Sequence, residues 1–267
     1  HMQYLGNDLK TIALEKLGIV KPGVDIIVSD NNKSLKKLFK DKINKNNLYY
    51  LNDNVKHISG NKLNSFSIKQ KDFPEFKFNT PLPGDFQIRN AAAAIITSIK
   101  YLEDSGIKPN VNKIRRGISN IVNNTGYRCR LETFKINNKE FILDVSHNPG
   151  GLKETYNTLK LNPPDIVIFG IMEDKDIESS VKQVLKLSKK IIFTKANYKK
   201  AAEPEKLLKL AKKYKPSQKN LYLTDNVQQA IKMIQEDKIT GNRILITGSF
   251  FLVSDAIKAL KIQKILR

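Results

Sequence analysis

The chain has 267 residues, 40% of them apolar, and 47 lysine and arginine residues against 26 acidic residues give a formal net charge of +21. This apolar content suffices for a packed core and argues against global disorder, and no apolar run reaches the roughly 20 residues needed to span a bilayer. Cys129 is the only cysteine, which excludes an intrachain disulfide and a zinc-finger type of metal site and predicts a reducing, cytoplasmic setting.

The excess of positive charge fits an anionic ligand such as nucleic acid, a nucleotide or a polycarboxylate. The lysines are nevertheless spread over nearly every predicted helix, as Lys182, Lys186, Lys189 and Lys190 illustrate. A solvated lysine surface explains this pattern equally well, so charge alone selects no partner.

The N-terminal half has an irregular pattern. Its predicted elements are a helix from Asp8 to Leu17 capped by Asn7, a strand at Ile26–Val28, a helix from Ser34 to Lys42, short strands at Ser65–Ile68 and Phe76–Asn79, and helices from Gln87 to Leu102 and from Val111 to Val122. His57 is interpreted as a surface loop residue. The polar break at 123–126 is the best boundary, which predicts domains over residues 1–124 and 131–267 joined by a linker at 125–130.

The C-terminal half alternates between short apolar strands and amphipathic helices. The strands are predicted at Asp165–Phe169, Ile191–Thr194, Leu221–Thr224 and Ile244–Thr247, and the helices at Ile177–Leu187, Pro204–Tyr214, Val227–Glu236 and Phe251–Leu260. Strands at Thr133–Ile136 and Phe141–Leu143 form a predicted hairpin at the sheet edge. This pattern predicts an α/β fold with a Rossmann-like, mostly parallel sheet.

The strand that ends at Leu143 is followed by a polar cluster of Asp144, His147 and Asn148. We expect Gly150 and Gly151 to form a sharp turn before a helix that starts near Leu152. Polar side chains at the carboxyl end of a strand are typical of a ligand site in an open α/β sheet. An ordinary loop built from turn-forming residues fits the same pattern.

Five segments carry a more specific signal. They are Leu5–Lys21, Gly84–Ala91, Arg130–Glu132, Asp144–Pro149, and Asp174–Asp176 after Gly170 together with Gly248-Ser249. In this order they resemble folylpolyglutamate and dihydrofolate synthases of the Mur ligase superfamily. The resemblance implies an ATPase-type central domain before the Rossmann-like domain. It also implies ATP-dependent ligation of L-glutamate to a folate through an acyl phosphate, with ATP and Mg²⁺ as cofactors.

The phosphate-binding loop of this family has no counterpart here, because no G-x-x-x-x-G-K-[S/T] pattern occurs. We therefore expect the chain to be the back part of a longer enzyme, truncated inside its central domain and inactive alone. The expected partners are folate or dihydropteroate, L-glutamate, ATP and the missing N-terminal segment. We expect a monomer that binds neither nucleic acid nor membrane.

The resemblance assigns nucleotide and metal roles in the first half. Lys16 matches the lysine that is carbamylated to become a Mg²⁺ ligand, and His1, fifteen positions earlier, matches a second metal ligand. His1 is equally compatible with a cloning remnant. Gln87 and Asn90 match residues that face the nucleotide, although a helix-capping role fits Asn90 too.

In the second half, Arg130 matches the linker arginine that reaches the γ-phosphate, with Arg128 as an alternative register. Asp144 is the expected nucleotide contact. His147 is the expected phosphate or substrate contact near the reacting centre. Lys16, Arg130 and His147 are thus the predicted catalytic side chains.

Lys175 and Ser249 match the side chains that hold the incoming glutamate. Asp174 and Asp176 are interpreted as turn and cap residues. Three alternatives remain open, namely another Mur ligase acting on a cell-wall precursor, a basic nucleic-acid-binding protein, and a non-catalytic module derived from a ligase.

Overall fold

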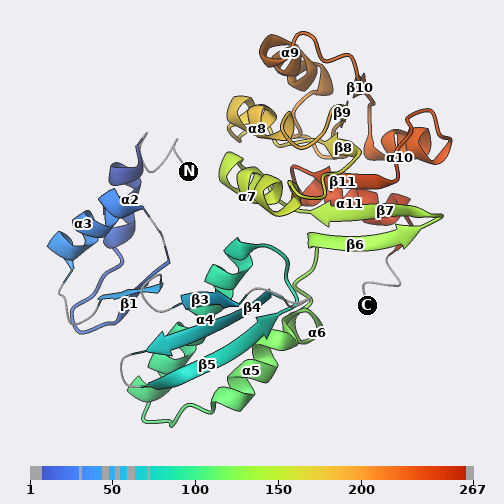
Figure 1. Cartoon of the computed structure of the whole chain (residues 1–267). Coiled ribbons are helices and arrows are strands. Elements are labelled where there is room, and N and C mark those ends of the chain that lie inside the picture. Colours follow the sequence, from blue (N-terminus) through green and yellow to red (C-terminus); the bar gives the residue numbers. More distant parts are fainter. Residues whose placement is uncertain are drawn as a thin grey trace. The chain divides into compact units, whose positions relative to one another are not determined.

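The structure, a computed structural model, describes residues 8–29, 32–43, 48–51, 55–58, 64–70 and 73–262. The chain divides into two compact units (Figure 1). Unit 1 comprises His1–Pro81 and Asp85–Asn124, and unit 2 comprises Leu82–Gly84 and Thr125–Arg267. Within the described ranges, no helix is long and apolar enough to cross a membrane.

Unit 1 combines two small sheets with helices. Its elements are α2 (Leu9–Leu17), β1 (Ile26–Val28), α3 (Lys33–Lys42), β2 (Leu48–Tyr50), β3 (Val55–Ile58), β4 (Asn64–Gln70), β5 (Phe73–Thr80), α4 (Asp85–Asp104), α5 (Val111–Ser119) and α6 (Ile121–Thr125), the last of which crosses into unit 2. Strands β1 and β2 pair in parallel, whereas β3, β4 and β5 form an antiparallel sheet.

The core of unit 1 lies between α4 and the antiparallel sheet. Ile88, Ala92 and Ile95 recur at helical spacing on the buried face of α4. They share one cluster with Phe66 of β4 and Phe78 of β5, whose ring centroids are 5.8 Å apart. The period of the apolar positions in α4 therefore fixes which face of the helix covers the sheet.

Three predictions about unit 1 are wrong in detail. Helix α2 is capped by Asp8, whose Oδ1 accepts the Thr11 N–H at 2.9 Å; Asn7, the predicted cap, lies outside the described residues. His57 lies in strand β3, paired with Phe66, rather than in a loop. The predicted helix from Val111 to Val122 is two helices.

The break between α5 and α6 has a local cause. Asn120 is the C-cap of α5, and its side-chain amide donates to the carbonyl of Arg116 at 3.0 Å. Asparagine favours such local side-chain bonds over continued helix. The apolar period continues across Asn120, which is why periodicity alone predicted one helix.

Unit 2 is a doubly covered α/β sheet. Its elements are β6 (Arg130–Ile136), β7 (Lys139–Asp144), α7 (Pro149–Leu159), β8 (Ile166–Phe169), α8 (Ile177–Val184), β9 (Lys190–Phe193), α9 (Pro204–Tyr214), β10 (Leu221–Leu223), α10 (Val227–Gln235), β11 (Arg243–Thr247) and α11 (Phe250–Ala259). The strand order is β10-β9-β8-β11-β7-β6, and all pairs are parallel except the β6–β7 hairpin. The predicted fold class is confirmed.

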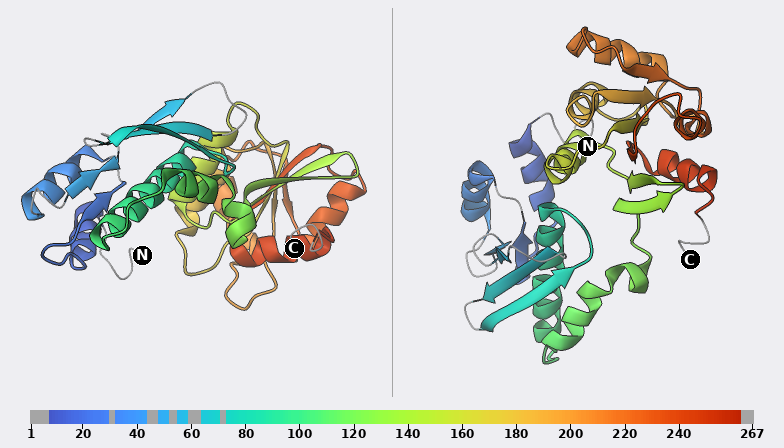
Figure 2. Two further views of the ribbon diagram at one scale, coloured as in Figure 1. Left: turned by 90° about the horizontal axis from the view of Figure 1, so that it is seen from below. Right: turned by 45° about the vertical axis from the view of Figure 1, so that its right-hand side comes forward.

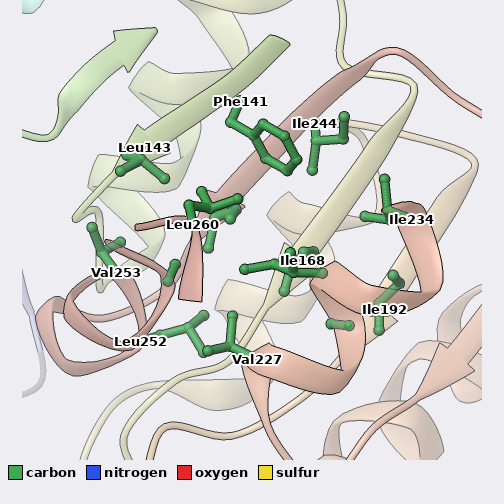
Figure 3. Packing of buried hydrophobic residues seen from close by; sticks show 14 of the residues in the cluster. Phe141, Leu143, Ile168, Ile192, Val227, Ile234, Ile244, Leu252, Val253 and Leu260 are labelled. Atoms are coloured by element: carbon green, nitrogen blue, oxygen red, sulfur yellow. The ribbon is translucent and has the colours of Figure 1, made fainter. Parts of the chain in front are cut away.

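Helices cover both faces of this sheet. Helices α7, α8 and α9 pack side by side on one face, and α10 packs with α11 on the other (Figure 1; Figure 2 shows the layers from two more sides). Figure 3 shows the second interface, where Ile168, Ile192 and Ile244 of the sheet meet Val227 and Leu252 of the helices. Because both faces are buried, β8 is apolar at every position, as is typical of a central parallel strand.

The strand order creates a switch point at β11. The chain proceeds outward from β7 through β8 and β9 to β10, and then returns to insert β11 between β7 and β8. The helices that follow β7 and β8 therefore lie on the face opposite to α11, which follows β11. Neighbouring strands whose helices diverge leave a crevice at their carboxyl ends, where α/β proteins bind ligands.

Candidate functional site

A pocket of about 310 Å³ lies at the carboxyl ends of the central strands of unit 2. Its lining includes His147, Lys175, Tyr198, Lys200, Ser249 and Phe250. His147 follows β7, Lys175 follows β8, and Ser249 follows β11. The switch point thus brings together three side chains that the sequence analysis selected from three distant segments.

His147 lines the pocket, and one of its ring nitrogens contacts the backbone. Its Nδ1 lies 3.0 Å from the carbonyl oxygen of Val145, and its ring centroid lies 5.5 Å from that of Phe250. Because a carbonyl oxygen only accepts hydrogen bonds, Nδ1 must carry the proton in this contact. The other nitrogen, Nε2, is then a proton acceptor in the neutral imidazole and a donor in the cation.

The loop that carries His147 ends earlier than predicted, because α7 begins directly after Asn148. Helix α7 begins at Pro149, and Asn148 caps it by accepting the Gly151 N–H at 2.8 Å. Gly150 and Gly151 lie in its first turn and do not form a separate turn. A side chain at Gly151 would approach within 3.2 Å of the Ser146 Cβ, so the glycine permits close packing of helix against loop.

Asp144 is buried beneath the loop and is not among the pocket-lining residues. It is 1% exposed, and its Oδ2 accepts the Thr155 hydroxyl at 2.7 Å. Burial raises the pKa of the Asp144 carboxyl, opposed by hydrogen bonds from Thr155 and Ser146 and by the charge of Arg130. Here the carboxylate organises the loop, and its role as a nucleotide contact stays a prediction.

Arg130 lies beside the pocket. Its guanidinium carbon is 4.9 Å from the ring centroid of Tyr127 and 5.6 Å from that of Phe250, which lines the pocket. Its buried Nε has no hydrogen-bond partner within the described part of the chain. Arg128, the alternative candidate, is instead tied to Glu132 by a bond of 2.7 Å from Nε. The geometry therefore favours Arg130 as the arginine available to a ligand.

The segment after β8 supplies a paired lysine. Lys175 Nζ donates to Asp174 Oδ2 at 2.9 Å, and this bond lowers the pKa of the Asp174 carboxyl. Asp176 caps α8 by accepting the Ser179 N–H at 3.0 Å, which confirms its interpretation as a cap. An anionic ligand at Lys175 would share or displace Asp174.

Ser249 lies at the tight turn between β11 and α11. Its Oγ accepts the Leu252 N–H at 3.0 Å and thereby caps the helix, which leaves the hydroxyl proton free to be donated. The preceding Gly248 has a φ of 121°, and a Cβ there would lie 2.3 Å from the carbonyl oxygen of Gly170. Only glycine fits where the ends of β8 and β11 approach so closely.

Sequence reasoning missed the loop that follows β9. Tyr198 stacks on Phe251 with ring centroids 4.0 Å apart, and Lys200 lines the same pocket. A backbone hydrogen bond of 2.8 Å from the Glu173 N–H to the Lys200 carbonyl joins this loop to the segment that follows β8. No motif marks these residues, and the one signal was their position after a parallel strand.

The remaining candidates, Gln87, Asn90, Lys16 and His1, belong to unit 1. Gln87 is 2% exposed, and within the described residues its Nε2 has no partner, as expected of an amide kept for a ligand. Asn90 donates to Gln87 Oε1 at 3.2 Å from inside α4, so the helix-capping interpretation of Asn90 is wrong. Lys16 is exposed in the last turn of α2. His1 lies outside the described residues.

A metal site does not assemble among the residues that the structure describes. No group of three His, Cys, Asp or Glu side chains there could hold a metal ion. The predicted pair of His1 and Lys16 is not tested by this finding, because His1 is not described. The Mg²⁺ site stays a prediction.

The comparisons with known proteins match this geometry. Residues 129–250 match the family model of the Mur ligase glutamate ligase domain. The predicted resemblance to folylpolyglutamate and dihydrofolate synthases is confirmed over nearly the whole chain. The dihydrofolate synthase/folylpolyglutamate synthase of Bacillus subtilis is 26% identical over 279 aligned residues, which cover 98% of this chain and 60% of that protein.

Further relatives agree. The folylpolyglutamate synthase of Lacticaseibacillus casei is 26% identical over 95% of this chain and 58% of its own length. The crystal structure of the Thermotoga maritima folylpolyglutamate synthase superimposes with a TM-score of 0.69 at 27% identity, over 94% of this chain and 57% of that one. The chain spans about 60% of the length of the curated relatives. A UDP-N-acetylmuramate–L-alanine ligase of Lactiplantibacillus plantarum matches 41% of the chain.

Proposed function

We propose that this chain is part of an ATP-dependent ligase that joins L-glutamate to a folate by an amide bond. The observation that carries the proposal is the convergence of His147, Lys175 and Ser249 on one pocket at the switch point. The relatives that match nearly the whole chain are folate enzymes, whereas the cell-wall ligase matches 41% of it. This difference favours a folate over a cell-wall precursor as the acceptor.

The charges at the pocket suit a dicarboxylic amino acid. Lys175 and Lys200 line it, and the N-terminus of α11 with the Ser249 hydroxyl adds hydrogen-bond donors. A lysine provides a mobile point charge that can pair with a carboxylate. In the proposed function, Lys175 exchanges Asp174 for a carboxylate of the incoming glutamate.

The reaction requires an uncharged amine. ATP transfers a phosphoryl group to the folate carboxylate, and the amine of glutamate attacks the acyl phosphate and displaces phosphate. An ammonium has no lone pair, so it must lose a proton before it attacks. His147 lines the pocket, and its Nδ1 bonds the Val145 carbonyl, so the other ring nitrogen, Nε2, is the proposed acceptor of that proton.

In this proposal, Arg130 binds the phosphoryl group that is transferred. A guanidinium binds phosphate oxygens through two parallel N–H bonds and neutralises the negative charge of the transferred group. The stacking of Arg130 between two aromatic rings limits its motion before the ligand arrives. Gln87 and Asn90 are the proposed contacts of the nucleotide base. Mg²⁺, when bound, would neutralise phosphate charge, and the described residues assign it no ligands.

The test is a ligase assay with ATP, glutamate and either a folate or dihydropteroate. It uses the whole protein, which means the complete ligase of which this chain is the proposed part. We expect Lys175→Met to raise KM for glutamate by at least about tenfold, because a charge-assisted bond contributes roughly 1.5–3 kcal/mol. Lys232→Met on α10, which removes a lysine 73% exposed, should leave KM unchanged. Absence of folate- and glutamate-dependent ADP formation by the unaltered whole protein would refute the proposed function.

A further inference from the structure

Glu132 makes two hydrogen bonds to the residues that directly precede its strand. It lies on β6 and is not among the pocket-lining residues. One carboxylate oxygen accepts the Arg128 guanidinium at 2.7 Å from Nε, and the other accepts the backbone N–H of Cys129 at 2.9 Å. The carboxylate therefore fixes both the side chain and the backbone that precede Arg130.

The backbone on both sides of Arg130 is unusual. Cys129 and Leu131 have φ values of 58° and 55°, in the left-handed region that disfavours residues with a Cβ by roughly 1–2 kcal/mol each. The β6–β7 register also shifts between Arg130 and Glu132, so Leu131 is the extra residue of a bulge. Bulges re-aim side chains next to functional sites. Such a conformation persists only where other contacts hold it.

Glu132 supplies such contacts. It bonds the Cys129 N–H while Cys129 is in the left-handed conformation, and the Cys129 carbonyl in turn accepts the Val145 N–H at 3.0 Å. The same carboxylate also binds the guanidinium of Arg128. Arg130 is left as the arginine that stacks between Tyr127 and Phe250, with its Nε unbonded within the described residues.

We propose that Glu132 is a positioning residue, which holds the left-handed backbone at Cys129 and keeps Arg128 away, so that Arg130 alone is presented at the pocket. Glu132 itself contacts no ligand. The role of Arg130 in this inference rests on the proposed function. The positioning of Arg130 by Glu132 is independent of that function. It can therefore be tested by both kinetics and spectroscopy.

The kinetic test is a double-mutant cycle on the whole protein. Glu132→Ala is expected to lower kcat by at least about tenfold with little change in KM for glutamate, because Arg130 acts on the transition state. In an Arg130→Ala background, Glu132→Ala should cause no further loss of kcat. Glu132→Gln, which keeps an acceptor for the Cys129 N–H, should show a smaller loss in the same direction and serves where the alanine variant does not fold.

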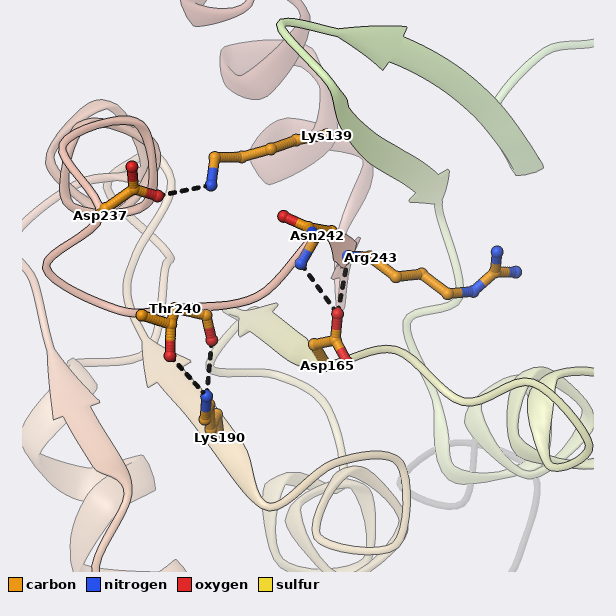
Figure 4. A network of polar contacts seen from close by, with 7 residues as sticks. All are labelled: Lys139, Asp165, Lys190, Asp237, Thr240, Asn242 and Arg243. Carbon is orange, nitrogen blue, oxygen red and sulfur yellow. Dashed lines mark hydrogen bonds and ion pairs between the residues drawn. The ribbon is translucent and has the colours of Figure 1, made fainter.

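The matched control breaks a similar ion pair elsewhere in unit 2. Glu140 pairs with Arg243 at the amino ends of β7 and β11, and Figure 4 draws Arg243 and its surroundings. The side chains there are 27% and 21% exposed, against 23% and 25% for Glu132 and Arg128. Glu140→Ala should lower the unfolding midpoint about as much as Glu132→Ala while kcat stays unchanged.

The spectroscopic test uses the Arg130 Nε–H resonance of this chain, assigned with Arg130→Lys. Ring currents from Tyr127 and Phe250 displace this signal, so Glu132→Ala should move it toward the random-coil position and Glu140→Ala should not. Additive losses of kcat in the cycle, or an unmoved resonance, would overturn the inference. An inactive whole protein with a resonance that moves as expected would refute the proposed function and leave the positioning role standing.

Discussion

Asp144 illustrates how burial sets the chemistry of a single residue. Its carboxyl is enclosed at the end of β7, and burial raises its pKa above the ordinary value. Between the ordinary and the raised value, the folded chain holds a proton that the unfolded chain has released. The contribution of Asp144 to stability is therefore greatest below that window and falls as pH rises through it.

We accordingly expect Asp144→Asn to remove this part of the pH dependence, because an amide does not titrate. Urea unfolding midpoints measured from acidic to neutral pH would show a smaller decline in the variant than in the unaltered chain. Asp237→Asn, at a carboxylate that is 71% exposed and paired with Lys139 (Figure 4), should keep the decline. An unchanged slope in Asp144→Asn would show that another group causes it.

A second prediction at this scale concerns Gly248. Alanine there must adopt a φ of 121° and place its Cβ 2.3 Å from the Gly170 carbonyl, so we expect a loss of about 2 kcal/mol or more. Gly117, inside α5, has open space around it, and alanine should raise stability by about 0.5–1 kcal/mol there. Chemical denaturation of both variants checks this pair, and equal effects would contradict it.

At the scale of elements, the helices that start at the carboxyl ends of the unit 2 strands share one kind of N-terminal cap. Four of them begin with a side chain that accepts a backbone N–H of the first turn. These caps are Asn148, Asp176, Asn226 and Ser249. Each cap satisfies one otherwise unpaired N–H of the first turn and thereby ties the residue before the helix to the helix itself. His147 precedes such a cap directly.

The cap of α7 should thus affect both stability and ligand binding. We expect Asn148→Ala and Asn226→Ala each to cost about 1 kcal/mol of stability, since each removes one capping bond. Only Asn148→Ala should also weaken glutamate binding or turnover, because it releases the loop that carries His147. Calorimetric unfolding together with the ligase assay separates the two effects. Equal activity in both variants would mean that the cap does not position His147.

On the scale of the whole molecule, the main apolar cluster among the described residues is larger in unit 2 than in unit 1. The main cluster of unit 2 joins the sheet to α10 and α11, whereas the described cluster of unit 1 joins α4 to β4 and β5, with partly buried residues of α5 packed against it. Fewer buried contacts imply easier local opening.

Hydrogen exchange should therefore be slower in unit 2. We expect the amides of β8, β9 and β11 to exchange last, close to the rate of global unfolding, and those of β1 and β2 to exchange much earlier. Exchange followed by mass spectrometry of peptides resolves these segments. Similar protection in β1 and β11 would show that the units unfold as one.

The sequence by itself determined the local features. Strict alternation of apolar strands with helices predicted the parallel sheet of unit 2, and the segments around Asp144, Lys175 and Ser249 predicted a ligand site, because these signals depend on near neighbours in the chain. Local periodicity failed at Asn120 and at Pro149, where a side-chain bond and a cap moved the helix ends.

Only the tertiary structure decided which side chains meet. The insertion of β11 between β7 and β8 depends on long-range pairing, and it alone brings Ser249 to His147 and adds Tyr198 and Lys200 to their pocket. The bond that ties Arg128 to Glu132 and the bulge beside Arg130 likewise form only in the folded hairpin. Burial of Asp144 arises only when several elements pack together, so no stretch of sequence could reveal it.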